Sequence, residues 1–325
     1  MRVVVAPDKF RGTLDARAAA AAISAPLRAA GHDVVELPMA DGGEGTLDAL
    51  GGANRVTTVS GPLGDPVDAG WRLESRRAVI EMARASGLAL VGDDPDAVAA
   101  STYGTGELIA AALDAGAREL VVGLGGSATT DGGLGALRAL YPTSRLRGVR
   151  ISVACDVRTT FVDAAAVFAP QKGATPAQVE LLTRRLERLI QVYVDDYGVD
   201  VSELEGGGAA GGLAGGLACI GAELVPGVEL VAEYVGLEDA LDGADAVITG
   251  EGALDSESFD GKVVGGVAEF ASGLGVPVVA IVGEREDIPS PIPVLSLVER
   301  YGATRAVEDA AACVAESALE ALEMI

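Results

Sequence analysis

The chain alternates short runs of β-branched residues with longer stretches rich in alanine and leucine. This alternation is typical of α/β folds in which helices connect parallel strands. The short runs are apolar almost throughout, which predicts strands that are covered on both faces. We expect strands at Arg2–Ala6, Val34–Leu37, Val79–Met82, Leu120–Gly123, Ile151–Ala154, Ala246–Thr249, Val276–Val282 and Val294–Val298. The sequence therefore predicts an α/β fold with a largely parallel sheet.

Local signals mark the ends of several helices. Thr105 can cap a helix that runs through Leu113 and ends at Gly116. Thr175-Pro176 opens a second helix, whose apolar residues recur at helical spacing as far as Tyr193, with Gly198 just beyond its end. A last helix is expected over about 306–324.

Two stretches qualify as domain boundaries. One is the turn-rich segment 61–66, and the other is the acidic segment 236–245. This pattern allows a discontinuous first domain, made of residues 1–60 and 241–325, with residues 61–240 inserted as a second domain.

The formal net charge of −24 excludes some classes of partner. A surface of this charge repels nucleic acids and anionic membranes, so neither is expected as a partner. The chain holds only three lysines, and abundant acid with scarce lysine fits a protein from a high-salt cytoplasm. An ordinary acidic protein from a GC-rich genome fits the same composition.

The apolar runs, the cysteines and the single histidine indicate the compartment of the protein and the kinds of site that it can contain. It has no run of 18 apolar residues, and its first residues indicate a strand rather than a signal peptide, so we expect a soluble, cytoplasmic protein. Cys155, Cys219 and Cys313 lie far apart, which favours neither a zinc site nor a disulfide framework. The single histidine, His32, lies in a turn, so histidine catalysis is not expected.

A glycine-rich segment, 123–133, follows an expected strand and precedes an expected helix. Glycines there free backbone amides for an anion, and the hydroxyls of Ser127, Thr129 and Thr130 add donors. Asp131 could reach a metal ion bound to phosphate. The segment also matches a degenerate dinucleotide-binding pattern, but arginines occupy 145–150, where an acid that binds ribose is expected. Phosphate binding is therefore the favoured interpretation, and a structural tight turn is the alternative.

Further acidic residues follow strands in glycine-rich surroundings. Asp41 and Glu44 lie among glycines after the second strand, and Glu251 lies between Gly250 and Gly252, with Asp255 and Lys262 shortly after. Ligands of open α/β sheets bind beyond the carboxyl ends of strands, so these loops could converge there.

Asp156 follows another strand, and Gln171 and Lys172 lie in a Pro-Gln-Lys-Gly-Ala segment. A glycine run at 206–212 lacks a preceding strand, which favours close helix packing there. No Walker A motif and no protein-kinase motif is present. Carboxylates, hydroxyls, glycines and isolated lysines suit metal-assisted phosphoryl transfer, in which positioning and charge neutralisation supply catalysis.

Taken in order, these motifs resemble the bacterial-type glycerate kinase family. The resemblance spans nearly the whole chain, and its collinear motifs make it specific. The matching segments are 6–8, 40–46, 80–88, 104–109, 125–133, 153–157, 170–174, 208–212, 247–256 and 261–262.

The resemblance implies a Rossmann-like domain built from both chain ends, an inserted α/β domain and an active site in the cleft between them. It also implies ATP and Mg²⁺ as cofactors, D-glycerate as substrate and 2-phosphoglycerate as product; a homodimer stays open. On this basis Asp41, Asp156 and Glu251 would bind Mg²⁺, Asp255 would help to orient the hydroxyl, and Lys172 would neutralise phosphate. The remaining residues expected to bind substrate or nucleotide are Asp8, Arg11, Gly42, Gly43, Glu44, Thr46, Gly125, Gly126, Ser127, Thr129, Asp131, Gln171, Gly211 and Lys262.

The chain departs from the family pattern in a few places. Lys9-Phe10-Arg11 replaces Ser-aromatic-Lys, Ala253 replaces an arginine, and a segment of the family is absent after Tyr141. The chain is therefore interpreted as a shortened, halophilic member. Two other hypotheses stay open: a non-catalytic protein that binds glycerate or nucleotide, and an NAD(P)-dependent oxidoreductase that uses the 123–133 loop.

Overall fold

The computed structural model describes residues 1–325 and divides into two compact units. Unit 1 comprises Met1–Asp41, Asp48–Leu50 and Gly227–Ile325, and unit 2 comprises Gly42–Leu47 and Gly51–Pro226. Both are α/β, and parallel pairing dominates their sheets, which confirms the fold class. None of the helices is both long and apolar enough to cross a membrane.

Unit 1 contains a five-stranded sheet in the order β11-β10-β9-β1-β2, in which every pair is parallel. Its strands are β1 (Arg2–Pro7), β2 (Asp33–Glu36), β9 (Ala246–Leu254), β10 (Val278–Arg285) and β11 (Val294–Ser296). The register sets Pro7 opposite Gly250, so β1 and β9 release their following residues at the same edge of the sheet.

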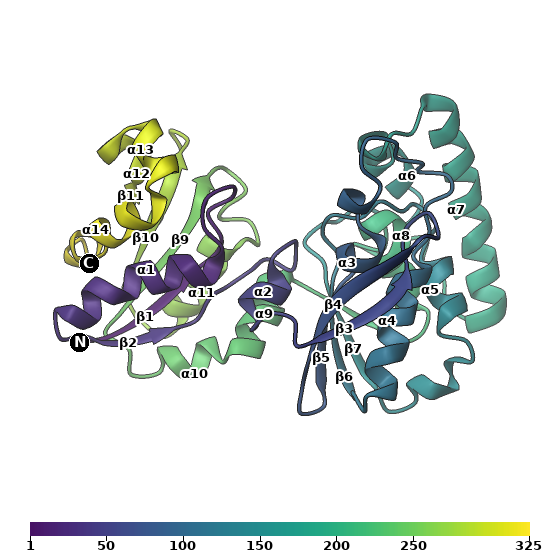
Figure 1. Cartoon of the computed structure of the whole chain (residues 1–325), viewed down its shortest axis with the longest axis horizontal. Coiled ribbons are helices and arrows are strands. Elements are labelled where there is room, and N and C mark those ends of the chain that lie inside the picture. Colours follow the sequence, from purple (N-terminus) through teal and green to yellow (C-terminus); the bar gives the residue numbers. More distant parts are fainter. The chain divides into compact units, whose positions relative to one another are not determined.

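Helices surround the sheet of unit 1 (Figure 1). They are α1 (Ala16–Ala29), α9 (Gly227–Val235), α10 (Leu237–Leu241), α11 (Val263–Gly273), α12 (Leu297–Tyr301), α13 (Ala303–Glu308) and α14 (Ala310–Glu323). Of these, α1, α11, α12 and α14 lie directly against the sheet. Ile23 of α1 and Val314 of α14 meet Val5 and Ile248 of the sheet in one buried cluster. The final helix predicted over 306–324 is divided, because Asp309 separates α13 from α14.

Unit 2 contains a six-stranded sheet in the order β3-β4-β5-β6-β7-β8. Its strands are β3 (Arg55–Ser60), β4 (Pro66–Glu74), β5 (Arg77–Glu81), β6 (Glu119–Gly123), β7 (Arg150–Ala154) and β8 (Glu223–Val225). Strands β5 to β8 are parallel, whereas β3 and β4 form an antiparallel hairpin that joins the sheet through β5. Segment 61–66, interpreted above as a domain boundary, is the turn of this hairpin.

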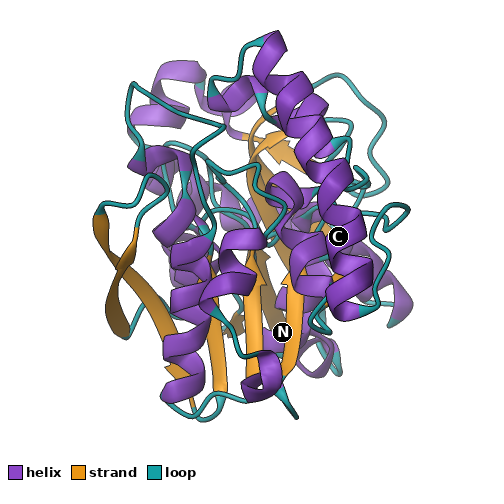
Figure 2. Cartoon of the chain, turned by 90° about the vertical axis from the view of Figure 1, so that its right-hand side faces the viewer, coloured by secondary structure: helices purple, strands orange, loops and turns teal.

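Helices lie over the strands of unit 2 (Figure 2). They are α3 (Ala83–Ser86), α4 (Tyr103–Asp114), α5 (Leu134–Ala139), α6 (Ala164–Phe168), α7 (Pro176–Tyr197) and α8 (Ala209–Ala218), and α2 (Thr46–Ala49) lies where the chain passes between the units. Short 3₁₀ turns cover Leu88–Leu90, Thr143–Leu146 and Pro170–Lys172.

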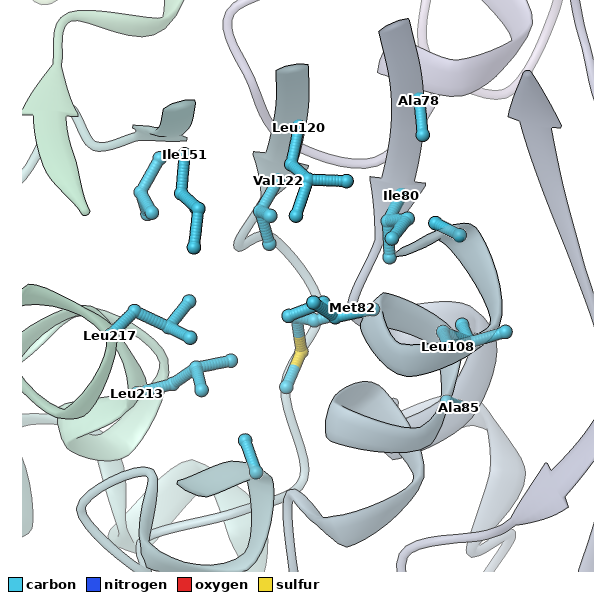
Figure 3. Close-up of a cluster of buried hydrophobic side chains, with 14 of the residues drawn as sticks. Ala78, Ile80, Met82, Ala85, Leu108, Leu120, Val122, Ile151, Leu213 and Leu217 are labelled. Atoms are coloured by element: carbon cyan, nitrogen blue, oxygen red, sulfur yellow. The ribbon is translucent and has the colours of Figure 1, made fainter. Parts of the chain in front are cut away.

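The core of unit 2 is built from aliphatic side chains. Ile80, Leu120, Val122 and Ile151 project from three adjacent strands toward Leu213 of α8 (Figure 3). Burial of each such side chain contributes about 1.5–3 kcal/mol. A core assembled in this way fixes the carboxyl ends of β5, β6 and β7, where the polar loops begin.

The start of α7 was predicted correctly from its cap. The Thr175 hydroxyl accepts a hydrogen bond from Gln178 N, and the Gln178 side chain accepts one from Thr175 N. This capping box and Pro176 at the first helical position satisfy or remove backbone donors that would otherwise lack partners. Gly198 ends the helix in the left-handed conformation, with φ of 72°.

Candidate functional site

Two buried carboxylates lie together at the edge of the unit 1 sheet. Asp8 follows β1 directly, and Glu251 lies in β9, one residue beyond the Pro7–Gly250 pair. The backbone N–H of Asp8 donates to the Gly250 carbonyl at 2.8 Å, which ties the two strand ends together. Asp8 is 8% exposed and Glu251 is 7% exposed. The parallel topology thus brings together two acids that are 243 positions apart.

Both acids have perturbed proton affinities. Burial raises the pKa of Asp8 to about 6; the nearby Asp41 carboxylate adds to the rise, while Lys9 and Arg11 oppose it. Burial likewise raises the pKa of Glu251 to about 7, with a further contribution from Asp8. Carboxylates with pKa values this close to neutrality are enriched at functional sites.

Glu251 also carries an orphaned atom. Its Oε1 is buried and has no hydrogen-bond partner. A buried acceptor of this kind costs about 1–3 kcal/mol unless a ligand satisfies it. This atom is therefore a point at which unit 1 can receive a cation or a hydroxyl donor.

Asp255 and Lys262 lie beside this pair but make other contacts. The Asp255 carboxylate accepts hydrogen bonds from Glu257 N at 2.9 Å and from Ser258 N at 3.1 Å, which closes the turn after β9. Lys262 Nζ lies 3.7 Å from Asp255 and 3.1 Å from Glu257. Asp255 thus shapes the loop, while half-exposed Lys262 remains a cation near Glu251.

In unit 2, the glycine loop after β6 lies against the glycine loop that contains residues 42–47. A Cβ atom on Gly125 would lie 2.7 Å from Gly43 Cα and 2.8 Å from Glu44 N. Only a residue without a side chain fits there. The 123–133 loop also pairs with the segment after α3, since Leu88 N donates to the Gly126 carbonyl at 2.8 Å. The 42–47 loop and the 123–133 loop therefore lie together and form one region rich in backbone groups, which includes Gly42, Gly126 and Ser127.

Glu81, at the end of β5, organises the 42–47 loop, and the sequence analysis did not select it as a site residue. Its Oε1 accepts hydrogen bonds from Gly45 N at 2.9 Å and Leu47 N at 2.8 Å, and its Oε2 accepts one from Arg84 Nε at 3.0 Å. The only sequence signal for Glu81 is that it is an acidic residue at the end of an apolar strand. Thr46, from the same loop, is buried and donates its hydroxyl to the Gly43 carbonyl.

Asp131 serves the architecture of the loop. Its carboxylate accepts hydrogen bonds from the backbone of Thr102, Gly133 and Gly135 and from the hydroxyls of Ser101 and Thr102. These contacts occupy the amides at the start of α5 and link them to the start of α4. An anion at this loop would consequently be bound by the amides and hydroxyl of the 125–127 segment.

Lys172 is buried, with 1% of its surface exposed. Its Nζ donates to the Thr129 carbonyl at 2.5 Å, and burial lowers the pKa of the ammonium group to about 8, although Asp131 limits the fall. Gly211 packs closely against the same carbonyl, since a Cβ there would lie 2.0 Å from Thr129 O. Lys172 and Gly211 therefore fix the far end of the glycine loop.

The other predicted residues lie at the surface. Arg11 and Glu44 are exposed, and Asp41 is half-buried. Asp156 is exposed two residues after the end of β7, and Gln171 is exposed beside Lys172. Side chains in these positions can reach a small solute without disturbing the core.

The chain alone offers no group of three or more His, Cys, Asp or Glu side chains arranged to hold a metal ion. Mg²⁺ bound to a nucleotide needs only one or two carboxylates, because phosphates and water supply its other ligands. The orphaned Glu251 Oε1 with the adjacent Asp8 fits that requirement.

Acids near the carboxyl ends of parallel strands, together with a glycine loop, are typical of α/β proteins that bind small molecules. The family model described as "Glycerate kinase family" matches residues 3–143 and 141–324. The chain belongs to the glycerate kinase family.

Individual relatives agree with this assignment. The chain is 41% identical to the "Glycerate kinase" of Halalkalibacterium halodurans, with 86% of this chain and 85% of the relative covered. It is 39% identical to the "Glycerate 2-kinase" of Escherichia coli, with 88% and 86% covered. A crystal structure of a putative glycerate kinase 2 from Salmonella typhimurium LT2 matches with a TM-score of 0.87 and 37% identity, over 100% of both chains.

Proposed function

We propose that this protein is a cytoplasmic enzyme that transfers the γ-phosphoryl group of ATP to the C2 hydroxyl of D-glycerate, with Mg²⁺, and forms 2-phosphoglycerate. The observation that carries this proposal is 39% identity, over most of both chains, to a relative named glycerate 2-kinase. The buried Asp8–Glu251 pair and the glycine loop supply groups that suit such a reaction.

Carboxylates would hold the metal ion and orient the acceptor hydroxyl. When bound, Mg²⁺ would neutralise the charge on the transferring phosphoryl group. We assign metal contacts to Glu251, Asp41 and Asp156, which lie in the segments that match the family. Lys262 and Arg11 would oppose the negative charge of phosphate and of the substrate carboxylate.

The glycine loop of unit 2 would bind phosphate through its backbone. Gly125, Gly126 and Ser127 present backbone amides and a hydroxyl outside the contacts of Asp131. Glu81 fixes one side of this surface, and Lys172 fixes the other. We therefore assign Lys172 a positioning role: it orders the loop through Thr129.

The test is nucleotide consumption by the full chain with D-glycerate and Mg²⁺. The buffer holds molar KCl, because the net charge of −24 and the scarcity of lysine favour a protein adapted to high salt. Consumption of ATP that depends on both glycerate and Mg²⁺ supports the proposal. Binding of glycerate or nucleotide by folded protein without turnover would support a non-catalytic member, and glycerate-dependent reduction of NAD⁺ or NADP⁺ would support an oxidoreductase.

A further inference from the structure

Unit 2 contains a cavity of about 560 Å³ beside the longest helix, α7. One wall is the face of α7 that carries Leu181, Arg188 and Val192, which recur at helical spacing. The opposite wall comes from Val98, before α4, and from the 130–134 part of the glycine loop. The cavity thus lies within one unit and adjoins the loop to which we assign phosphate binding.

The charge of the lining is unusual for this chain. Arg184, Arg185 and Arg188 all line the cavity, in a protein with a net charge of −24. Arg185 donates to the Val98 carbonyl at 3.0 Å, and Arg184 lies 3.9 Å from Glu180, whereas Arg188 has neither an ion-pair nor a hydrogen-bond partner. Guanidinium groups that lack carboxylate partners are suited to binding carboxylate or phosphate.

The only acid in the lining does not oppose this charge directly. The carboxylate of Asp131 is occupied by the donors of Ser101, Thr102, Gly133 and Gly135. Apart from Thr130, the remaining lining side chains are aliphatic. A ligand that fits this lining has an apolar body and one anionic group.

A second, independent feature points to a ligand. Thr130 lines the cavity and is 1% exposed, yet its buried hydroxyl oxygen has no hydrogen-bond partner. A buried hydroxyl without a partner carries a free-energy cost that a polar ligand atom would remove.

We propose that this cavity is a binding site for a small organic anion, with an apolar carbon body and one carboxylate or phosphate group. The arginines bind the anionic group, the leucine and valine side chains contact the carbon body, and the Thr130 hydroxyl gains a partner. The site is separate from the groups to which we assign the phosphoryl transfer, and its occupancy does not depend on that function.

The test is calorimetric titration of the full chain with hexanoate, hexyl phosphate and hexanol. Both anions are expected to bind at least about tenfold more tightly than hexanol, because a hydrogen bond to a charged group is stronger than one to a neutral group. The two anions distinguish a carboxylate ligand from a phosphate ligand. Saturating D-glycerate is expected to leave their affinities unchanged.

Variants of lining residues test whether the anions bind in this cavity. Arg188→Gln, at an exposed position, is expected to weaken both anions about tenfold, and Thr130→Val is expected to weaken them several-fold. The matched control is Arg147→Gln, an exposed arginine outside the cavity, which is expected to bind as the wild type does. Unchanged affinity in both Arg188→Gln and Thr130→Val, equal affinity for hexanol, or competition by D-glycerate would overturn the proposal.

Discussion

The buried ammonium group of Lys172 donates a hydrogen bond of 2.5 Å to the backbone carbonyl of Thr129. The two residues are 43 positions apart, and their contact ties the 3₁₀ turn before α7 to the glycine loop after β6. A buried cation therefore helps to fix the far end of the loop, together with the close contact of Gly211.

Replacing Lys172 with methionine is expected to reduce turnover about hundredfold, because a small displacement of catalytic groups has effects of this size. The fold should persist, since methionine fills a similar volume. Burial lowers the pKa of Lys172 to about 8, so only the unfolded chain gains a proton as the pH falls from about 10.5 to 8. Wild-type unfolding free energy should therefore rise relative to Lys172→Met by about 3 kcal/mol between pH 8 and 10.5.

Urea unfolding of both proteins across that pH range measures the difference. A constant difference between wild type and Lys172→Met from pH 8 to 10.5 would contradict the buried, desolvated lysine. Near-normal turnover of the Lys172→Met variant would show that Lys172 is not needed to position the glycine loop.

Glu251 should make the unfolding free energy fall as the pH rises, which is opposite to the effect of Lys172. Its folded pKa of about 7 exceeds the ordinary value of 4.5, so the unfolded chain loses the proton first as the pH rises. The wild type should lose stability relative to Glu251→Gln between about pH 4.5 and 7, by roughly 3 kcal/mol. Turnover of Glu251→Gln should be strongly reduced even though this variant is the more stable protein above pH 7.

Thermal unfolding in a series of buffers without Mg²⁺ checks this prediction. Glu257→Gln is the matched control, because Glu257 lies in the same loop and its side chain is 75% exposed. If Glu251→Gln and Glu257→Gln show the same pH profile, Glu251 is not the buried carboxyl of this site.

Glu81 should contribute to both stability and rate. Glu81→Leu leaves the amides of Gly45 and Leu47 without their acceptor, which should destabilise the protein by about 2–5 kcal/mol. Glu81→Gln keeps one acceptor oxygen and should have a smaller effect on both unfolding free energy and turnover. Denaturant titration and initial rates measure the series, and equal losses in the two variants would contradict the role of these hydrogen bonds.

The sequence predicted several features that depend on local patterns, although α4 begins at Tyr103, before the predicted cap Thr105. The apolar runs identified β1, β6 and β7, and Asp156 could be selected from its position after a strand, whereas Asp8 was selected through the family resemblance. The cap at Thr175 gave the start of α7. The alternation of strands and helices gave the α/β class.

Features that depend on tertiary contacts could not be predicted. β3 and β4 were missed because their exposed, polar residues, such as Thr58 and Asp68, hide the pattern of a buried strand. Glu81 acts on amides 34 and 36 positions earlier, and the sequence gives no sign of this contact. The burial of Lys172 likewise follows from packing against a distant loop, since lysines are ordinarily exposed.

Gly211 tests the packing of the glycine loop. Gly211 has φ of +69°, and a Cβ there would lie 2.0 Å from Thr129 O, whereas Gly221 has φ of +90° with no atom within 4 Å of its Cβ position. Gly221→Ala should therefore show only backbone strain of about 1–2 kcal/mol. Gly211→Ala should lose clearly more stability and most of its turnover, and equal melting temperatures for the two variants would contradict the close contact.

The most direct test of the central claim is identification of the product formed from D-glycerate, ATP and Mg²⁺ by ³¹P NMR. We predict a single new phosphomonoester with the spectrum of 2-phosphoglycerate, which does not form when glycerate or Mg²⁺ is left out. A 3-phosphoglycerate product would contradict the assigned position of transfer. The absence of any phosphorylated glycerate, with protein whose circular dichroism shows it to be folded, would contradict the proposed activity.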